Sequence, residues 1–129
     1  MPLVSMHKLA FKAAEATHCS KEQEKFWEMH DSMMSDPQKL GELNSYAESI
    51  NLDIAQFEGC LSSNKYDNEV RKDMALAQKL GVTGTPSFVL ARTNPDDPAK
   101  VKGISSLRGA QPLAAFKKII DEELSKKDE

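Results

Sequence analysis

A proline immediately before an apolar strand constrains the fold of this 129-residue chain more than any other feature. Residues 81–90 read GVTGTPSFVL, so that Thr85-Pro86 stands directly before the apolar run that begins at Ser87. Proline has no N–H to donate to a β-ladder, and it is therefore confined to the first residue of a strand, an edge strand or a bulge. The stretch predicts a strand from Ser87 onward. Pro86 is then either an ordinary strand-entry proline or a cis-proline with a function.

Composition indicates one soluble domain. The chain is 40% hydrophobic and 29% charged, with a net charge of −3, and this mild acidity argues against a nucleic-acid partner. No apolar stretch approaches the length of a membrane span, and the apolar run in MPLVSMHKLAFK at residues 1–12 is too short for a signal peptide. We therefore expect a cytoplasmic protein if the chain is complete as given, and a periplasmic or exported one if it is a fragment of a longer precursor.

Helical patterns dominate the first part of the chain, after a short extended candidate at residues 2–6. The spacing of apolar residues predicts helices near residues 7–17, 20–35, 40–50, 53–61 and 70–80. Ser20 with Gln23 has the form of a capping box that would open the second helix, and Asp53 would cap the fourth. Asn51 and Gly81 stand where residues in the left-handed conformation commonly end a helix.

Strand patterns appear only late in the chain. Residues 87–91 and 101–107 predict two strands, joined by the polar loop RTNPDDPAK at residues 92–100. Pro112 opens a closing helix, whose apolar residues are expected to point inward: Leu113, Phe116, Ile119, Ile120 and Leu124. The predicted fold is of the α/β class, mostly helical, with a C-terminal β-hairpin and a closing helix.

Several segments, taken in this order, resemble the DsbA-like branch of the thioredoxin superfamily. They are AAEATHC at 13–19, KFWEMHD at 25–31, the Tyr46-Ala47 helix that ends in INLD at 50–53, FEGCL at 57–61, GVTGTPSFVL at 81–90 and RGAQPLAAFKKIID at 108–121. The Gly-Val-x-Gly-x-Pro pattern also occurs in kappa-class glutathione transferases and isomerases, which remain an alternative. The resemblance implies a thioredoxin-like fold with a helical insertion, a cis Thr85–Pro86 peptide, and thiol–disulfide exchange with extended peptides.

The resemblance also implies how the chain is organised. Residues 1–129 would form a single DsbA-like domain. Residues 1–6 would be the remnant of a strand, residues 7–80 the helical insert, and residues 81–129 the strand–hairpin–strand–helix half of the thioredoxin core. One βα unit of the family pattern has no counterpart, so the fold is expected to be truncated at the N-terminus.

The catalytic motif of the family is missing from this chain. In the family, a strand leads into Cys-x-x-Cys at a helix N-terminus, where the pKa of the attacking thiol is lowered. Cys19 and Cys60 are the two cysteines of the chain, and they stand far apart. We therefore expect either a fragment of a longer oxidoreductase or a redox-inactive form that keeps a peptide-binding or assembly role. No catalytic residue is assigned, and the chain alone is predicted to be inactive.

The resemblance implies substrate-binding residues and a candidate disulfide. In the family, the backbone beside the cis-proline pairs with an extended substrate, and the matching positions are Gly84, Thr85 and Pro86. Cys19 and Cys60 are either two buried free thiols or the second, non-catalytic disulfide that some relatives carry. Their Cα atoms are expected within bridging range, about 4.4–6.8 Å apart. The three histidines show no zinc-ligand spacing, so we expect neither a metal nor a cofactor.

Assembly follows from the implied topology. Residues 87–91 would be a central strand, flanked by the 101–107 strand on one side and by the missing strand on the other. An unpaired edge on such an apolar segment readily recruits another strand. We therefore expect a homodimer built across the 87–91 edge. The other expected partner is an extended peptide or unfolded protein; neither nucleic acid nor membrane is expected.

Overall fold

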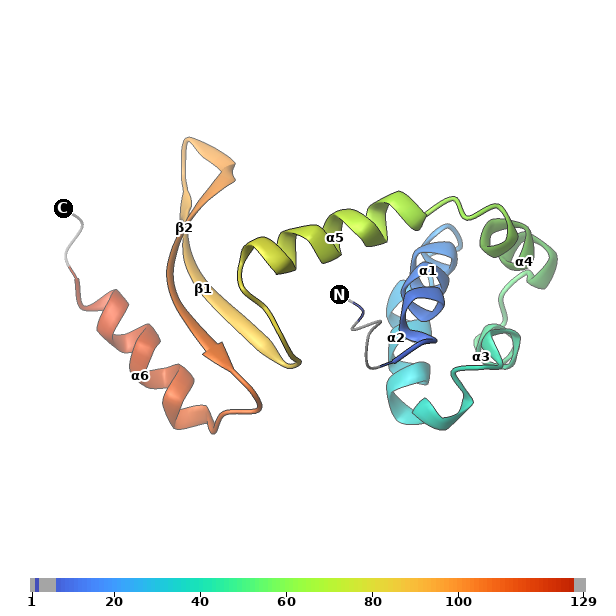
Figure 1. Cartoon of the computed structure of the whole chain (residues 1–129), viewed down its shortest axis with the longest axis horizontal. Coiled ribbons are helices and arrows are strands. Elements are labelled where there is room, and N and C mark those ends of the chain that lie inside the picture. Colours follow the sequence, from blue (N-terminus) through green and yellow to red (C-terminus); the bar gives the residue numbers. More distant parts are fainter. Residues whose placement is uncertain (1, 3–6, 127–129) are drawn as a thin grey trace. The chain divides into compact units, whose positions relative to one another are not determined.

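Helices form the first part of the chain, and a β-hairpin followed by one helix forms the rest (Figure 1). The computed structural model describes Pro2 and residues 7–126, and it divides into two units, Met1–Gly81 and Val82–Glu129. The elements are α1 (Ala10–Lys21), α2 (Phe26–Ser35), the 3₁₀ turn η1 (Pro37–Lys39), α3 (Leu43–Ser49), α4 (Ile54–Ser62), α5 (Asp67–Lys79), β1 (Ser87–Asn94), β2 (Asp97–Arg108) and α6 (Leu113–Leu124). Except for Pro2, the expected strand remnant at residues 1–6 lies outside the described residues.

Helix α1 is the centre of the first unit, because it packs against α2, α3, α4 and α5. Its buried face consists largely of small side chains, among them Ala13 and Ala16, which let the neighbouring helices approach closely. The larger side chains come from those neighbours: Met29 and Phe57 are fully buried. The whole cluster of buried residues is Ala13, Ala16, Cys19, Met29, Met33, Tyr46, Ala47, Leu52, Phe57 and Cys60.

Three predicted helix boundaries of this unit are confirmed. The Asp53 side chain caps α4, since its Oδ1 accepts a hydrogen bond from the Gln56 backbone N–H at 3.0 Å. Asn51 and Gly81 have φ values of 57° and 70°, the left-handed conformation that commonly ends a helix. These boundaries depend on single residues with a strong local preference.

The predicted capping box at Ser20 is wrong. Helix α1 continues through this residue to Lys21, and the fully buried Ser20 hydroxyl donates to the Thr17 carbonyl at 2.8 Å. Gln23 is engaged elsewhere: its Oε1 accepts from the Asp53 N–H at 2.8 Å, and its Nε2 donates to the Asp53 carbonyl at 3.1 Å. A serine hydroxyl can bond to a carbonyl of its own helix or cap the start of the next helix. Ser20 makes the first kind of bond, because its expected capping partner Gln23 bonds to Asp53 instead.

The second unit begins with an antiparallel hairpin. Strands β1 and β2 pair from Ser87 opposite Arg108 to Asn94 opposite Asp97. The predicted 92–100 loop is therefore too long, because both strands extend into it and the turn lies at Pro95-Asp96. Side chains close this turn: Asn94 Oδ1 accepts from the Asp96 N–H at 2.9 Å, and Asp97 Oδ1 accepts from the Ala99 N–H at 3.3 Å. Short polar side chains that bond nearby backbone groups stabilise tight turns.

Helix α6 packs on one face of the hairpin. The Phe116 ring meets the Phe88 ring edge-on, with centroids 4.9 Å apart, and Arg92 Nε donates to Glu123 Oε1 at 2.7 Å. The prediction that the apolar residues of this helix all point inward is wrong, because Leu113 is 82% exposed and Leu124 is 75% exposed. Within residues 82–126, as described, no side chain is buried.

Candidate functional site

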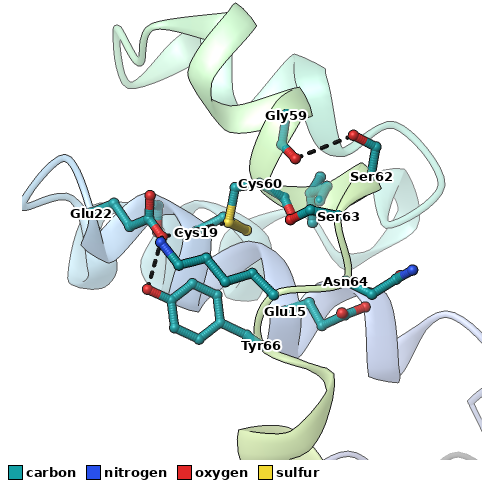
Figure 2. Close-up of a disulfide and its surroundings, with 12 residues drawn as sticks. Glu15, Cys19, Glu22, Gly59, Cys60, Ser62, Ser63, Asn64 and Tyr66 are labelled. Atoms are coloured by element: carbon teal, nitrogen blue, oxygen red, sulfur yellow. Dashed lines mark hydrogen bonds and ion pairs between the residues drawn. A yellow bond between two sulfur atoms is a disulfide. The ribbon is translucent and has the colours of Figure 1, made fainter.

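The two cysteines form a disulfide between α1 and α4, with Cα atoms 5.8 Å apart (Figure 2). This distance confirms the predicted bridging range, and of the two alternatives left open by the sequence the structure has the bridge. Both sulfur-bearing residues are buried, with 2% of Cys19 and 7% of Cys60 exposed. The bond therefore joins two helices of the core.

A carboxylate cluster borders this disulfide. Glu22 Oε1 accepts a hydrogen bond from the Tyr66 hydroxyl at 2.9 Å and forms an ion pair with Lys65 Nζ at 2.5 Å. The same oxygen lies 3.8 Å from Cys60 Sγ, and Figure 2 shows Glu22 and Tyr66 beside the sulfur atoms. Lys65, followed by the Tyr66 hydroxyl, lowers the pKa of Glu22, so an ionised carboxylate paired with the Lys65 ammonium lies next to the Cys60 sulfur.

The partners of Glu22 are affected in turn. The carboxylate raises the pKa of Lys65 by accepting its hydrogen bond, whereas burial and then Glu22 raise the pKa of Tyr66. The Tyr66 ring also stacks on the His18 imidazole, with centroids 5.1 Å apart. All these contacts lie within the first unit.

A second carboxylate, that of Glu15 in α1, is buried close to the disulfide (Figure 2), with 1% of the residue exposed. Its contact is an ion pair in which Lys12 Nζ lies 2.8 Å from Oε2, although the geometry is not that of a hydrogen bond. The same Lys12 ammonium donates to Asn64 Oδ1 at 2.7 Å, in the loop between α4 and α5. Lys12 thereby connects the buried carboxylate to that loop.

The sequence reasoning did not identify either carboxylate. Glu22 and Tyr66 are 44 residues apart, and no local pattern connects them. For Glu15, a lysine three residues earlier on an alanine-rich helix was the one available signal. Among the described residues, no group of three His, Cys, Asp or Glu side chains is placed to hold a metal ion.

The predicted substrate-binding residues form a loop of the second unit, at the entrance to β1. The Thr85–Pro86 peptide bond is cis, which is the conformation that the resemblance implies. Ser87 Oγ donates to the Gly84 carbonyl at 2.6 Å, and the Gly109 N–H donates to the Pro86 carbonyl at 2.8 Å. These bonds hold the loop at both ends and leave Thr85 and Pro86 exposed, with Gly84 half-buried.

The cis-proline loop and the helical unit are features of one class of protein, the thioredoxin-like domains of DsbA type. Residues 3–121 match the family described as DSBA-like thioredoxin domain. Because the match extends over nearly the whole chain, the chain belongs to the DSBA-like thioredoxin domain family, which is thiol–disulfide oxidoreductase-like. This match and the order of elements confirm the predicted thioredoxin-like, mostly helical fold with a β-hairpin followed by a closing helix.

Two curated relatives are much longer proteins. The chain is 32% identical over 108 residues to the Na(+)/H(+) antiporter NhaA 3 of Salinispora tropica, which covers 82% of this chain and 17% of the antiporter. It is 34% identical over 90 residues to the Na(+)/H(+) antiporter NhaA 1 of Salinispora arenicola, covering 68% of this chain and 14% of the antiporter. No solved structure shows significant similarity. None of the helices in the described part of the chain combines the length and apolar character that crossing a membrane requires.

Proposed function

We propose that this chain is a DsbA-type oxidoreductase-like domain that binds extended polypeptide at Gly84, Thr85 and Pro86 and does not itself exchange disulfides. The observation that carries the proposal is the exposure of Thr85 and Pro86 at the entrance to β1, in a chain that belongs to the DSBA-like family. Because the chain spans 17% and 14% of the curated relatives, their antiporter activity is not transferred to it.

The state of the two cysteines supports the absence of exchange. Disulfide exchange requires an accessible thiolate that attacks, or an accessible disulfide that is attacked. Cys19 and Cys60 are the two cysteines of the sequence, and they are joined to each other and buried in the core of the first unit.

The geometry of the loop supports peptide binding. Thr85 and Pro86 are exposed immediately before β1. An extended peptide bound there would therefore lie alongside the start of that strand. Main-chain hydrogen bonds to an exposed strand edge are a common source of affinity for peptides. The bonds at Gly84 and Pro86 keep the loop in one conformation, which lowers the entropy cost of binding.

The test compares two proline substitutions. Binding of a cysteine-free extended peptide with alternating apolar residues is measured by calorimetry for the wild type, Pro86→Ala and Pro98→Ala. We expect Pro86→Ala to weaken binding about tenfold, because it changes the loop proposed to contact the peptide. Pro98 lies in β2, away from the loop, and P98A should bind as the wild type does. Equal loss in both variants, or none in either, would contradict the proposed site.

Absence of exchange is measured on the same proteins by reduction of insulin. No turnover is expected from the wild type or from the double variant C19S/C60S. Turnover by the wild type that disappears in the double variant would instead make the cysteine pair catalytic.

A further inference from the structure

Five aromatic rings of the first unit form a continuous series. The Tyr66 ring stacks on the His18 imidazole with centroids 5.1 Å apart, and the His18 ring meets the Phe26 ring at 6.2 Å. The series continues from Phe26 to Trp27 at 5.2 Å and from Trp27 to His30 at 5.6 Å. Ring pairs with centroids about 4.5–7 Å apart are in contact. The series therefore connects α2 to the residue that precedes α5 without a break.

Two of these five rings, Trp27 and Tyr66, are easily oxidised. Trp27 is the single tryptophan of the chain, and it is 68% exposed. Indole and phenol side chains lose one electron far more readily than imidazole or phenyl rings do. Trp27 and Tyr66 can therefore each hold a radical, whereas the His18 and Phe26 rings between them provide only a path for the electron.

The Tyr66 hydroxyl has the proton acceptor that its oxidation requires. A phenol that loses an electron becomes strongly acidic and gives its proton to a neighbouring base. The Tyr66 hydroxyl donates to Glu22 Oε1 at 2.9 Å (Figure 2). Lys65 is the main cause that lowers the pKa of Glu22, and burial is the main cause that raises the pKa of Tyr66. At rest the carboxylate is therefore ionised and the phenol keeps its proton, ready for transfer.

The second tyrosine has neither feature. The chain has two tyrosines. Tyr46 is 4% exposed, and its hydroxyl donates to the Asp36 carbonyl, a neutral amide oxygen that does not take up a proton. Within the described part of the chain, no aromatic ring contacts the Tyr46 ring. Of the two tyrosines, Tyr66 alone combines ring contacts with a proton acceptor.

We propose that the first unit is a radical relay, in which a one-electron oxidation of Trp27 moves to Tyr66. An oxidising radical, such as an inorganic or peroxyl radical, takes one electron from the Trp27 indole, which releases its N–H proton to water. Trp27 then regains an electron from Tyr66 and a proton from water, while the Tyr66 hydroxyl proton moves to Glu22. The net change is one electron passed from Tyr66 to the oxidant and one proton passed from Tyr66 to Glu22.

The order of oxidation potentials gives this transfer its direction. At neutral pH a phenol that can release its proton is easier to oxidise than an indole, so the radical moves from Trp27 to Tyr66. A disulfide is harder to oxidise than either ring, although Cys60 Sγ lies 3.8 Å from the carboxylate that takes the proton. The relay therefore ends at Tyr66 and leaves the neighbouring disulfide intact.

The test is pulse radiolysis of the full chain with the azide radical, which oxidises indole selectively. The dose is kept low, so that each protein molecule is oxidised at most once. We expect the visible absorption of the tryptophanyl radical to decay as the near-ultraviolet band of the tyrosyl radical rises, at a rate independent of protein concentration. Decay without a matching rise, or a rate proportional to protein concentration, would overturn the proposal, and neither outcome depends on a variant.

Two matched pairs of variants identify the rings. Tyr66→Phe should abolish the tyrosyl band, whereas Tyr46→Phe should leave its amplitude and rate unchanged. His18→Leu removes a ring of the path and should cause loss of most of the band, whereas His30→Leu, which removes the ring on the other side of Trp27, should not. Equal effects within either pair would show that the radical takes another path. Far-UV circular dichroism verifies that each variant is folded.

Glu22→Gln tests the proton acceptor. A glutamine side chain can accept a hydrogen bond but does not take up a proton at neutral pH, so we expect the tyrosyl radical to form about tenfold more slowly or less. Glu28→Gln is the control, because Glu28 is a carboxylate of α2 whose ion pair is with Lys25; its rate should equal that of the wild type. An E22Q rate as fast as that of E28Q would refute transfer of the proton to Glu22.

Discussion

Reduction of the Cys19–Cys60 disulfide should destabilise the first unit strongly. The bridge joins residues that are 41 positions apart, in α1 and α4. On the chain-entropy account, cross-linking a loop of this length removes enough freedom from the unfolded chain to stabilise the folded state by about 4 kcal/mol. A domain of this size has a total stability of about 5–15 kcal/mol. The bridge therefore accounts for a large share of the stability of the helical unit.

The native contacts suggest that little strain offsets this gain. The bond lies among the side chains of the helical core, and its Cα separation of 5.8 Å is within the usual range of about 4.4–6.8 Å. After reduction the same side chains remain, so the loss should come from the unfolded state. We therefore expect the free energy of unfolding to fall by close to the full value.

The assay is urea unfolding of the full chain with and without a thiol reductant, followed by far-UV circular dichroism, which is dominated by the helices of the first unit. The double variant C19S/C60S is the control, because its unfolding curve should not respond to the reductant. A difference below about 1 kcal/mol between oxidised and reduced protein would refute the entropic reasoning. It would mean that the unfolded chain is already compact between the two cysteines.

Two further predictions concern single polar residues. Asp53→Ala removes the cap of α4 and should lower the free energy of unfolding by about 1 kcal/mol in urea titration, with no change expected for Ser45→Ala on an exposed turn of α3. Lys65 and Tyr66 lower the pKa of Glu22 in the folded state. The contribution of Glu22 to the free energy of unfolding is therefore fully present above the pKa that the group has in the unfolded chain, and it is lost as the pH falls through the lower pKa of the folded state. Glu22→Gln should therefore flatten the acid limb of stability against pH, whereas an unchanged slope would show that the cluster does not couple to folding.

Features determined by neighbouring residues could be predicted from the sequence. The cap at Asp53 and the left-handed residues Asn51 and Gly81 follow from the chemistry of single side chains and their immediate surroundings. Proline before an apolar run was enough to predict the start of β1 at Ser87. These signals survive in the fold because the tertiary contacts agree with them.

Features determined by distant residues could not be predicted. Ser20 and Gln23 have the form of a capping box, but Gln23 bonds to the backbone of Asp53, thirty residues later. The carboxylate cluster likewise requires α1 to meet the loop before α5, and only then does Glu22 reach Lys65 and Tyr66. The sequence alone left open whether Cys19 and Cys60 are free thiols or a disulfide, because two cysteines are written in the same way in both cases.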